Sequence, residues 1–257
     1  MENEILEVPV GMNDLGAILK DICKKKTGYQ RISPVHFILP VSAGNGQTTA
    51  TRFVAESLQA GGVRRFGGLE LFLEYRLDGT MDQMKKIFHR NIRENAVYTN
   101  DYEGVISFDI TALSPHSKGI QTSFFIEEVR KISTSATLIF FVGENPTPGL
   151  LNIVGKLKAS IRNLQVVQVN AYSVDELAWI IEKELAGRNI CMVPEDNFHA
   201  ALCEIVKHRQ AETVRDALSI MEEAAISADY SEQRPVLHVS DFPVVFSDCY
   251  GEEKTKK

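Results

Sequence analysis

The stretch that constrains this chain most runs from Phe37 to Thr49 and reads FILPVSAGNGQTT. Its apolar start, residues 37–41, predicts a buried parallel strand. A short loop with two glycines follows, and apolar residues then recur at helical spacing from about Gln47. Gly61 and Gly62 predict the end of that helix. A strand, a glycine loop and a helix in this order are the elements of a phosphate-binding turn, in which loop amides and the helix N-terminus face an anion.

The loop departs from the pattern that binds nucleoside triphosphates, G-x-x-x-x-G-K-[ST]. Gly46 and Thr48 match it, whereas Val41 replaces the first glycine and Gln47 replaces the lysine. A glutamine donates a neutral hydrogen bond worth about 1 kcal/mol, against roughly 1.5–3 kcal/mol for a charge-assisted one. We therefore expect triphosphate affinity to be lower by about tenfold or more. A glycine turn without any ligand is the alternative interpretation.

Composition and charge exclude several classes. The chain has 257 residues, 44% of them hydrophobic, which is enough for one large domain or one domain with a smaller one attached. Its net charge is −6 and it has no basic stripe, so we do not expect nucleic acid as a partner. The N-terminus is acidic, and no apolar run approaches the roughly 20 residues of a membrane span. These features predict a cytoplasmic protein without membrane insertion.

The cysteines and histidines indicate no metal site at this stage. The four cysteines are scattered, and none of the six histidines pairs with a cysteine or aspartate at ligand spacing. We expect free thiols in a reducing compartment, with Cys191 and Cys203 packed as small hydrophobic residues.

Strands alternate with helices as far as residue 170. Apolar or alternating segments predict further strands over residues 69–77, 105–109, 137–142 and 166–169. Periodic apolar residues predict further helices over residues 13–22, 80–88, 121–132 and 150–161. This order predicts an α/β domain, residues 1–170, with a parallel sheet flanked by helices.

The remainder, residues 171–257, predicts a small helical domain with a short C-terminal extension. Ser173 and Glu176 form a capping-box pattern before the first of three expected helices. These helices cover residues 174–185, 194–207 and 212–225. A polar linker, residues 227–234, and a tail that adds one strand or helix cap complete the prediction.

Polar residues follow three of the predicted strands at the carboxyl edge of the sheet, where ligands bind in parallel sheets. They are the loop residues 44–49, Asp109 after its strand, and the pair Glu144 and Asn145. An aspartate that ends a strand, together with a loop hydroxyl such as that of Thr48, is a common way to hold magnesium. A structural role for Asp109 is the alternative.

On these residues the chain resembles the AAA+ ATPases, most closely the group of the rubisco activase CbbX and stage V sporulation protein K. Residues 36–50 resemble the Walker A strand and loop, and residues 105–109 resemble Walker B. The resemblance implies a P-loop NTPase-like core, a helical lid, ATP or ADP with Mg²⁺ as cofactors, and oligomers with another AAA+ protein or a client. It implies nucleotide contacts at Ala43, Gly44, Asn45, Gly46, Gln47, Thr48, Thr49 and Arg215.

The same resemblance assigns roles to single residues. Thr48 and Asp109 would hold magnesium, and Asn145, or else Glu144, stands at the sensor-1 position. Arg162 stands where the family places an arginine that reaches a neighbour's nucleotide; a surface arginine is the alternative. Arg215 lies in the sensor-2 region, although another alignment places Glu212 there.

Two departures argue against hydrolysis: Gln47 replaces the Walker A lysine, and Ile110 replaces the Walker B glutamate that orients the attacking water. Our first hypothesis is a degenerate AAA+ protein with weak or absent nucleotide binding that serves as a subunit or scaffold. The second is a divergent but active ATPase that remodels a protein client and recruits substitute groups such as Lys156, Lys158, Glu144 or Asp101. The third is a nucleic-acid-handling subunit like those of clamp loaders.

Overall fold

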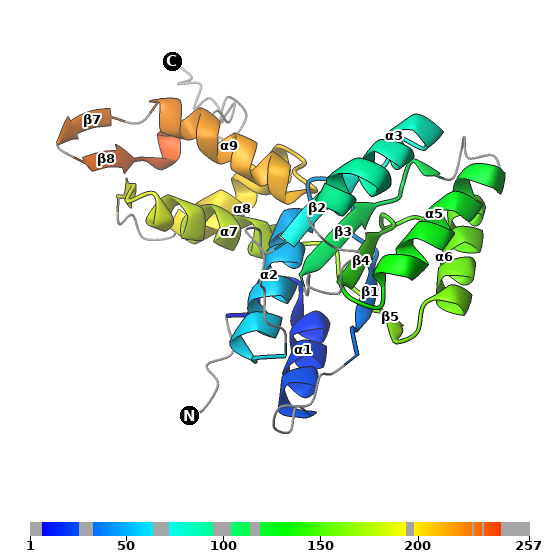
Figure 1. Ribbon diagram of the computed structural model, residues 1–257. Helices are drawn as coiled ribbons and strands as arrows, with labels where there is room; N and C mark the ends of the chain where they lie inside the picture. Colours follow the sequence, from blue (N-terminus) through cyan, green and yellow to red (C-terminus); the bar gives the residue numbers. More distant parts are fainter. Residues whose placement is uncertain are drawn as a thin grey trace, which may run out of the picture. The chain divides into compact units, whose positions relative to one another are not determined.

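The computed structural model describes residues 7–25, 33–63, 72–94, 104–113, 119–193, 198–227, 229–232 and 234–242. The chain divides into two compact units, Met1–Asn170 and Ala171–Lys257. Figure 1 shows a sheet with helices in the first unit and a cluster of helices with short strands in the second. No helix in the described part of the chain combines the length and the apolar character needed to cross a membrane.

The first unit is built on a five-stranded sheet with the order β2-β3-β4-β1-β5. Every neighbouring pair of strands is parallel. The strands are β1 (His36–Leu39), β2 (Phe72–Arg76), β3 (Val105–Asp109), β4 (Thr137–Phe141) and β5 (Leu164–Val166). All residues of β1, β3 and β4 are buried, as expected for parallel strands covered on both faces. The predicted α/β fold class is thereby confirmed.

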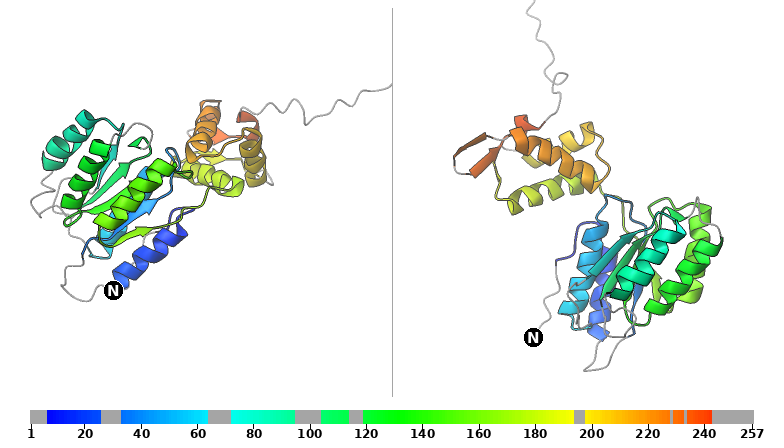
Figure 2. Two further views of the ribbon diagram at one scale, coloured as in Figure 1. Left: turned by 90° about the vertical axis from the view of Figure 1, so that its right-hand side faces the viewer. Right: turned by 45° about the horizontal axis from the view of Figure 1, so that its top comes forward.

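Helices cover both faces of this sheet (Figures 1 and 2). They are α1 (Asn13–Lys25), α2 (Gln47–Ala60), α3 (Met81–Lys86) with its π-helical continuation η1 (Ile87–Ile92), α5 (Gly119–Ile132) and α6 (Pro148–Ser160). Successive strand residues point to opposite faces. Phe37 and Leu39 of β1 therefore pack with α1 and α2. Ile38 between them belongs to the cluster formed with α3, η1, α5 and α6.

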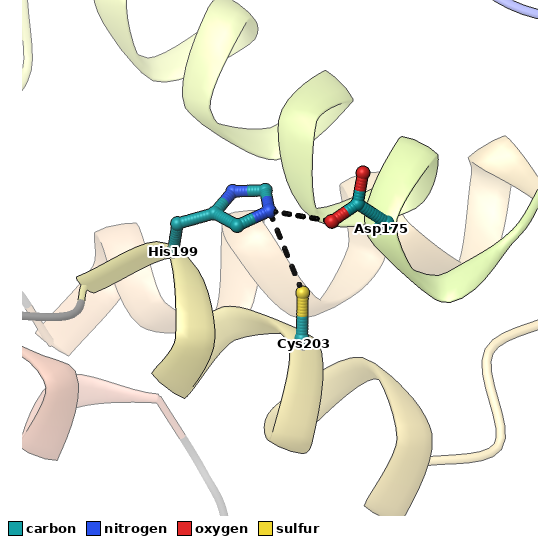
Figure 3. Close-up of side chains that lie close together, drawn as sticks. All are labelled: Asp175, His199 and Cys203. Atoms are coloured by element: carbon teal, nitrogen blue, oxygen red, sulfur yellow. Dashed lines mark hydrogen bonds and ion pairs between the residues drawn. The ribbon is translucent and has the colours of Figure 1, made fainter.

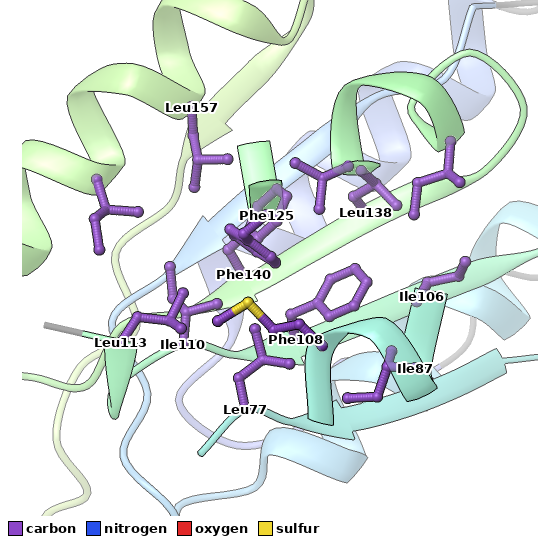
Figure 4. Packing of buried hydrophobic residues seen from close by; sticks show 14 of the residues in the cluster. Leu77, Ile87, Ile106, Phe108, Ile110, Leu113, Phe125, Leu138, Phe140 and Leu157 are labelled. Atoms are coloured by element: carbon purple, nitrogen blue, oxygen red, sulfur yellow. The ribbon is translucent and has the colours of Figure 1, made fainter. Parts of the chain in front are cut away.

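Aromatic rings lie at the centre of the cluster that contains Ile38 (Figure 4). The ring of Phe108 on β3 stacks on that of Phe140 on β4, with centroids 6.0 Å apart. The ring of Phe125 from α5 meets Phe108 edge-on at 5.7 Å. Such offset and edge-to-face pairs add to the stabilisation from buried area. These ring contacts pack β3 and β4 against α5. The candidate site lies at the carboxyl ends of these two strands.

The second unit contains α7 (Val174–Gly187), α8 (Phe198–His208), α9 (Val214–Ser227) and the 3-10 turn η3 (Val239–Asp241). The predicted capping box of α7 is confirmed. The Ser173 Oγ accepts a hydrogen bond from the backbone N–H of Glu176 at 3.2 Å, and the Glu176 carboxylate accepts one from the N–H of Ser173 at 2.8 Å. Leu177, Ile181 and Leu202 are among the fully buried residues of this unit's core.

The second unit, predicted as three helices with a polar linker and a tail, also contains a small sheet. A three-stranded sheet, β6-β8-β7, is formed by Cys191–Met192, Arg234–Leu237 and Asp229–Glu232. β7 lies within the stretch predicted as a polar linker. Its antiparallel neighbour β8 begins at the last residue of that stretch and continues into the tail, which was predicted to add one strand or helix cap. These strands are two to four residues long, so backbone pairing defines them and no alternation of apolar residues marks them.

Several predicted boundaries also shift. The last strand of the large sheet is Leu164–Val166, because these residues pair with His36–Ile38 of β1. Val167 remains tied to the sheet through the Ile38 carbonyl at 3.0 Å, but the chain then leaves the ladder. The helix predicted from residue 150 begins at Pro148, since Thr147 caps it. Parts of the predicted strand 69–77, helix 194–207 and tail lie outside the described residues.

Candidate nucleotide-binding site

The loop between β1 and α2 forms a tight turn at the carboxyl edge of the sheet. Gly44 and Gly46 have φ angles of 97° and 83°, a region that glycine adopts without steric cost. The N–H of Asn45 donates to the Ser42 carbonyl at 3.1 Å and closes the turn. Gly46 caps α2 without any side-chain hydrogen bond, so the first N–H groups of the helix have no side-chain partner at the cap. A glycine turn that leads into a helix N-terminus in this way is compatible with anion binding.

Gln47 is turned back onto its own loop. Its Nε2 donates to the Val41 carbonyl at 3.1 Å, and Val41 itself is buried. The Gln47 side chain therefore ties the end of the loop to its beginning, and it carries no positive charge.

Asp109 ends β3 beside this loop and is only 5% exposed. One of its carboxylate oxygens accepts hydrogen bonds from the N–H and the Oγ1 of Thr111, at 3.1 and 2.6 Å. The other lies 3.9 Å from the Nε of Arg76, whose side chain is largely exposed. One oxygen is thus occupied by the protein, and the other has a long contact to a solvent-facing arginine.

Glu144 joins the loop from the neighbouring strand β4. Its Oε1 accepts a hydrogen bond of 2.6 Å from the Asn45 Nδ2, and its N–H lies 3.4 Å from the Ser42 Oγ. A Cβ on Gly143 would lie 3.4 Å from the Thr111 side chain and 3.9 Å from the Ser42 Oγ. The segments that follow β1, β3 and β4 therefore meet at one place, as the sequence predicted for the carboxyl ends of parallel strands.

Asn45 is the most enclosed polar residue of the loop, at 6% exposure. Its Oδ1 has no hydrogen-bond partner. A buried acceptor without a partner destabilises the protein unless a donor reaches it, so the Asn45 Oδ1 is a group that a ligand or water could satisfy.

The three segments that meet here contribute acidic side chains, and Arg76 of β2 contacts one of them at 3.9 Å. The three converging segments, residues 41–49, 109–113 and 142–145, contain no lysine or arginine. They contain the carboxyl groups of Asp109 and Glu144.

The other predicted residues are placed as follows. Ala43, Thr48, Thr49 and Asn145 are exposed around the loop. Arg162 is exposed just before the amino end of β5, at the sheet edge opposite the loop. Arg215 is exposed on α9 of the second unit. Lys156 and Lys158 lie on α6, and Asp101 lies outside the described residues.

Ile110 points away from the site. Its side chain is fully buried in the hydrophobic cluster around Phe108 and Phe140, while its N–H donates to the Phe141 carbonyl at 3.0 Å. The residue that the sequence resemblance matched to the Walker B glutamate is thus a core residue.

One group of side chains was missed by the sequence analysis. His199 contacts both Asp175 and Cys203 in the second unit, so the prediction that no histidine pairs with a cysteine or aspartate was wrong. The four-residue spacing of His199 and Cys203, which puts both on one helix face, was the available signal.

Comparison with solved structures shows the same fold. The chain is similar to a mutant of Thermotoga maritima RuvB (17% identity, covering 86% of this chain and 64% of that one, TM-score 0.53). It is similar to domain III of the Thermotoga maritima replication initiation protein DnaA (13% identity, 88% and 86%, TM-score 0.53). It is also similar to C. elegans PCH-2 (10% identity, 88% and 65%, TM-score 0.54).

These neighbours are AAA+ ATPases, and the first unit has their P-loop NTPase fold, followed by a helical C-terminal part. At identities between 10% and 17%, the similarity shows a shared fold and nothing more. The chain spans a little under two thirds of the RuvB and PCH-2 chains. The sequence matches no protein-family model and no curated protein.

Proposed function

We propose that this chain is a degenerate AAA+ module that binds ATP or ADP weakly or not at all, hydrolyses neither, and acts as a subunit or scaffold in a larger assembly. The proposal rests on the hydrogen bonds made at the loop between β1 and α2. The Gln47 amide is committed to the Val41 carbonyl, and the Glu144 carboxylate is hydrogen-bonded to Asn45. Gln47, where the resemblance expects a lysine, therefore carries no positive charge, and the Glu144 carboxylate lies beside the loop.

Ile110 supports the second part of the proposal. Hydrolysis needs a group that orients and polarises the attacking water. The isoleucine at this position is buried in the core and can do neither. Glu144 is an acid near the loop, but its carboxylate oxygen is held by Asn45.

Residual binding would rest on the backbone. The uncapped start of α2 attracts anions, and Asp109 with Thr48 would hold magnesium in the manner of related folds. Arg162, exposed at the opposite edge of the sheet, would serve a neighbouring subunit's nucleotide and not the one in its own chain. We propose a homo-oligomer, or an assembly with another AAA+ protein or a client.

The test combines thermal unfolding with an assay of phosphate release. A ligand that binds only the folded state at about 100 times its Kd adds about 2.7 kcal/mol, which shifts Tm by several degrees. We expect a smaller shift or none with millimolar ATP–Mg²⁺ or ADP, and no phosphate release. Magnesium-dependent phosphate release that Asp109→Ala abolishes would refute the proposal and establish a divergent ATPase.

The assembly role has its own test. Sedimentation of the full chain, alone and with a competent AAA+ partner, measures association. Arg162→Ala should lower the partner's ATPase rate, whereas Arg130→Ala, an exposed arginine on α5, should leave it unchanged. Equal effects of the two substitutions would remove the role proposed for Arg162.

A further inference from the structure

Three potential metal-binding side chains lie together in the second unit (Figure 3). The Nε2 of His199 is 3.0 Å from a carboxylate oxygen of Asp175 and 3.6 Å from the Sγ of Cys203. All three ligand atoms lie within 4.8 Å of one another. One nitrogen, one oxygen and one sulfur atom are therefore close enough together to contact the same ion.

Two helices that pack on each other bring these residues together. Asp175 is in the first turn of α7, and His199 and Cys203 are one helical turn apart on α8. The core beneath them includes Leu177, Ile181 and Leu202, all fully or almost fully buried. The backbone that carries the three side chains is consequently fixed by the packing of α7 on α8.

The separations fit one tetrahedral ion. Zinc binds histidine nitrogen at about 2.0 Å, carboxylate oxygen at about 2.1 Å and cysteine sulfur at about 2.3 Å. Tetrahedral angles then put nitrogen and sulfur roughly 3.5 Å apart, and nitrogen and oxygen roughly 3.4 Å apart. The observed 3.6 and 3.0 Å are within a few tenths of an ångström of these values. The Asp175 oxygen and the Cys203 sulfur lie within 4.8 Å of each other and would be roughly 3.6 Å apart around the ion.

Glu182 completes the arrangement from α7. Its Oε2 lies 3.1 Å from the Nδ1 of His199, the ring nitrogen that faces away from the other two residues. Histidines that bind metals through one nitrogen usually donate the other N–H to a carboxylate, which fixes the tautomer and the ring orientation. Glu182 is in the right place to do this.

The same residues are poorly arranged for a cysteine nucleophile. A catalytic base needs its Nε2 free to take the thiol proton, but Asp175 competes for that atom. Burial, together with the charges of Asp175 and Glu182, raises the pKa of the Cys203 thiol, which disfavours the thiolate. A divalent cation reverses this effect, because it stabilises the thiolate and compensates both carboxylates.

We propose that Asp175, His199 and Cys203 bind one Zn²⁺ ion, with Glu182 orienting the histidine. Sulfur and imidazole ligands select zinc over magnesium or calcium, which prefer oxygen. The ion takes the places of the protons on Nε2 and Sγ, which leave to solvent. The fourth position faces water, since the Asp175 side chain is 80% exposed. The ion clamps the start of α7 to α8.

The experiment titrates the chelator-stripped full chain with Co²⁺ and then Zn²⁺. We expect one equivalent of Co²⁺ to produce the charge-transfer absorption of a thiolate ligand and the intense visible bands of a tetrahedral site. Zn²⁺ should displace the cobalt and raise Tm. Cys203→Ser should abolish the charge-transfer band, and Glu182→Gln should weaken zinc binding by about tenfold or more.

Cys191→Ser is the matched control, because Cys191 is an exposed cysteine of the same unit that lies outside the cluster. It should leave the spectrum unchanged, and Cys249→Ser should do the same. The proposal fails if Cys203→Ser retains the charge-transfer band, if either control removes it, or if no thiolate band appears at all. Far-ultraviolet circular dichroism verifies that each variant is folded.

Discussion

The Nδ2 of Asn45 donates a hydrogen bond of 2.6 Å to the Oε1 of Glu144, across 99 positions of sequence. The two residues follow β1 and β4, which are neighbours in the sheet. Their contact ties the glycine loop to the adjacent segment and places a carboxylate against that loop. This acidic group comes from a residue that the loop sequence does not contain.

Removing this charge should strengthen nucleotide binding. Glu144→Gln keeps an oxygen that can accept from Asn45 but removes the negative charge, and we expect a gain of roughly 1 kcal/mol, or about fivefold in ATP affinity. Gln47→Lys should add about tenfold by replacing a neutral hydrogen bond with a charged one. Isothermal titration calorimetry with ATP–Mg²⁺ measures both.

Asn145, the other candidate for the sensor-1 position, is also exposed beside the loop, and its substitution distinguishes the two assignments. Asn145→Ala should leave ATP affinity unchanged if Glu144 is the residue that faces the loop. If Asn145→Ala lowers the affinity and Glu144→Gln has no effect, the sensor-1 role belongs to Asn145 instead.

Replacing Ile110 by the glutamate expected at Walker B should destabilise the protein. Ile110 is fully buried in an apolar cluster, and Ile110→Glu would leave a carboxylate there without a partner. We expect a loss of about 3 kcal/mol or more in the free energy of unfolding, measured by urea denaturation. Ile110→Val, which only shortens the side chain, should cost about 0.5–1.5 kcal/mol. A glutamate variant as stable as the valine variant would show that this side chain can turn to solvent.

The start of α9 should lose stability in acid. The Asp216 carboxylate accepts hydrogen bonds from the Oγ1 and N–H of Thr213 at 2.8 and 3.0 Å. The hydroxyl of Thr213, followed by backbone N–H groups and the charge of Arg215, lowers the pKa of this carboxyl. Its stabilising effect is complete above the unfolded-state pKa of about 3.9 and disappears as pH falls through the lower folded-state value.

Asp216→Asn tests this pH dependence, because asparagine does not titrate. At about pH 6 we expect the variant to be less stable by about 0.5–1 kcal/mol, at the low end for a cap since the residue is exposed. The difference between variant and wild type in urea unfolding should shrink towards pH 3. A difference independent of pH would contradict the role assigned to the carboxylate.

The capping box of α7 should stabilise the first turn of that helix. Ser173→Ala removes the acceptor for the Glu176 N–H, and we expect a cost of about 1 kcal/mol. Hydrogen exchange should quicken in the first turn of α7, where Asp175 also lies. Ser219→Ala, at an exposed position within α9, is the control and should change stability by less than about 0.5 kcal/mol. Equal effects of the two would argue that serine loss as such, and not the cap, is responsible.

Local patterns predicted most of the α/β unit. Apolar runs such as residues 105–109 and 137–142 identified strands buried on both faces, and Ser173 with Glu176 identified the start of α7. The short strands β6, β7 and β8 escaped prediction, since two to four residues carry no periodicity. The degeneracy of the site, the resemblance to one AAA+ group and the role of Arg162 remain predictions.

The amino-acid sequence alone determined the order of strands and helices, the glycine turn and the absence of a lysine from it, because these depend on residues close together in the chain. Only the tertiary structure decided which distant side chains meet. The sheet order β2-β3-β4-β1-β5 brings Glu144 to Asn45, and the packing of α7 on α8 brings Asp175 to His199. These contacts depend on pairing and packing between segments far apart in sequence, which local periodicity does not encode.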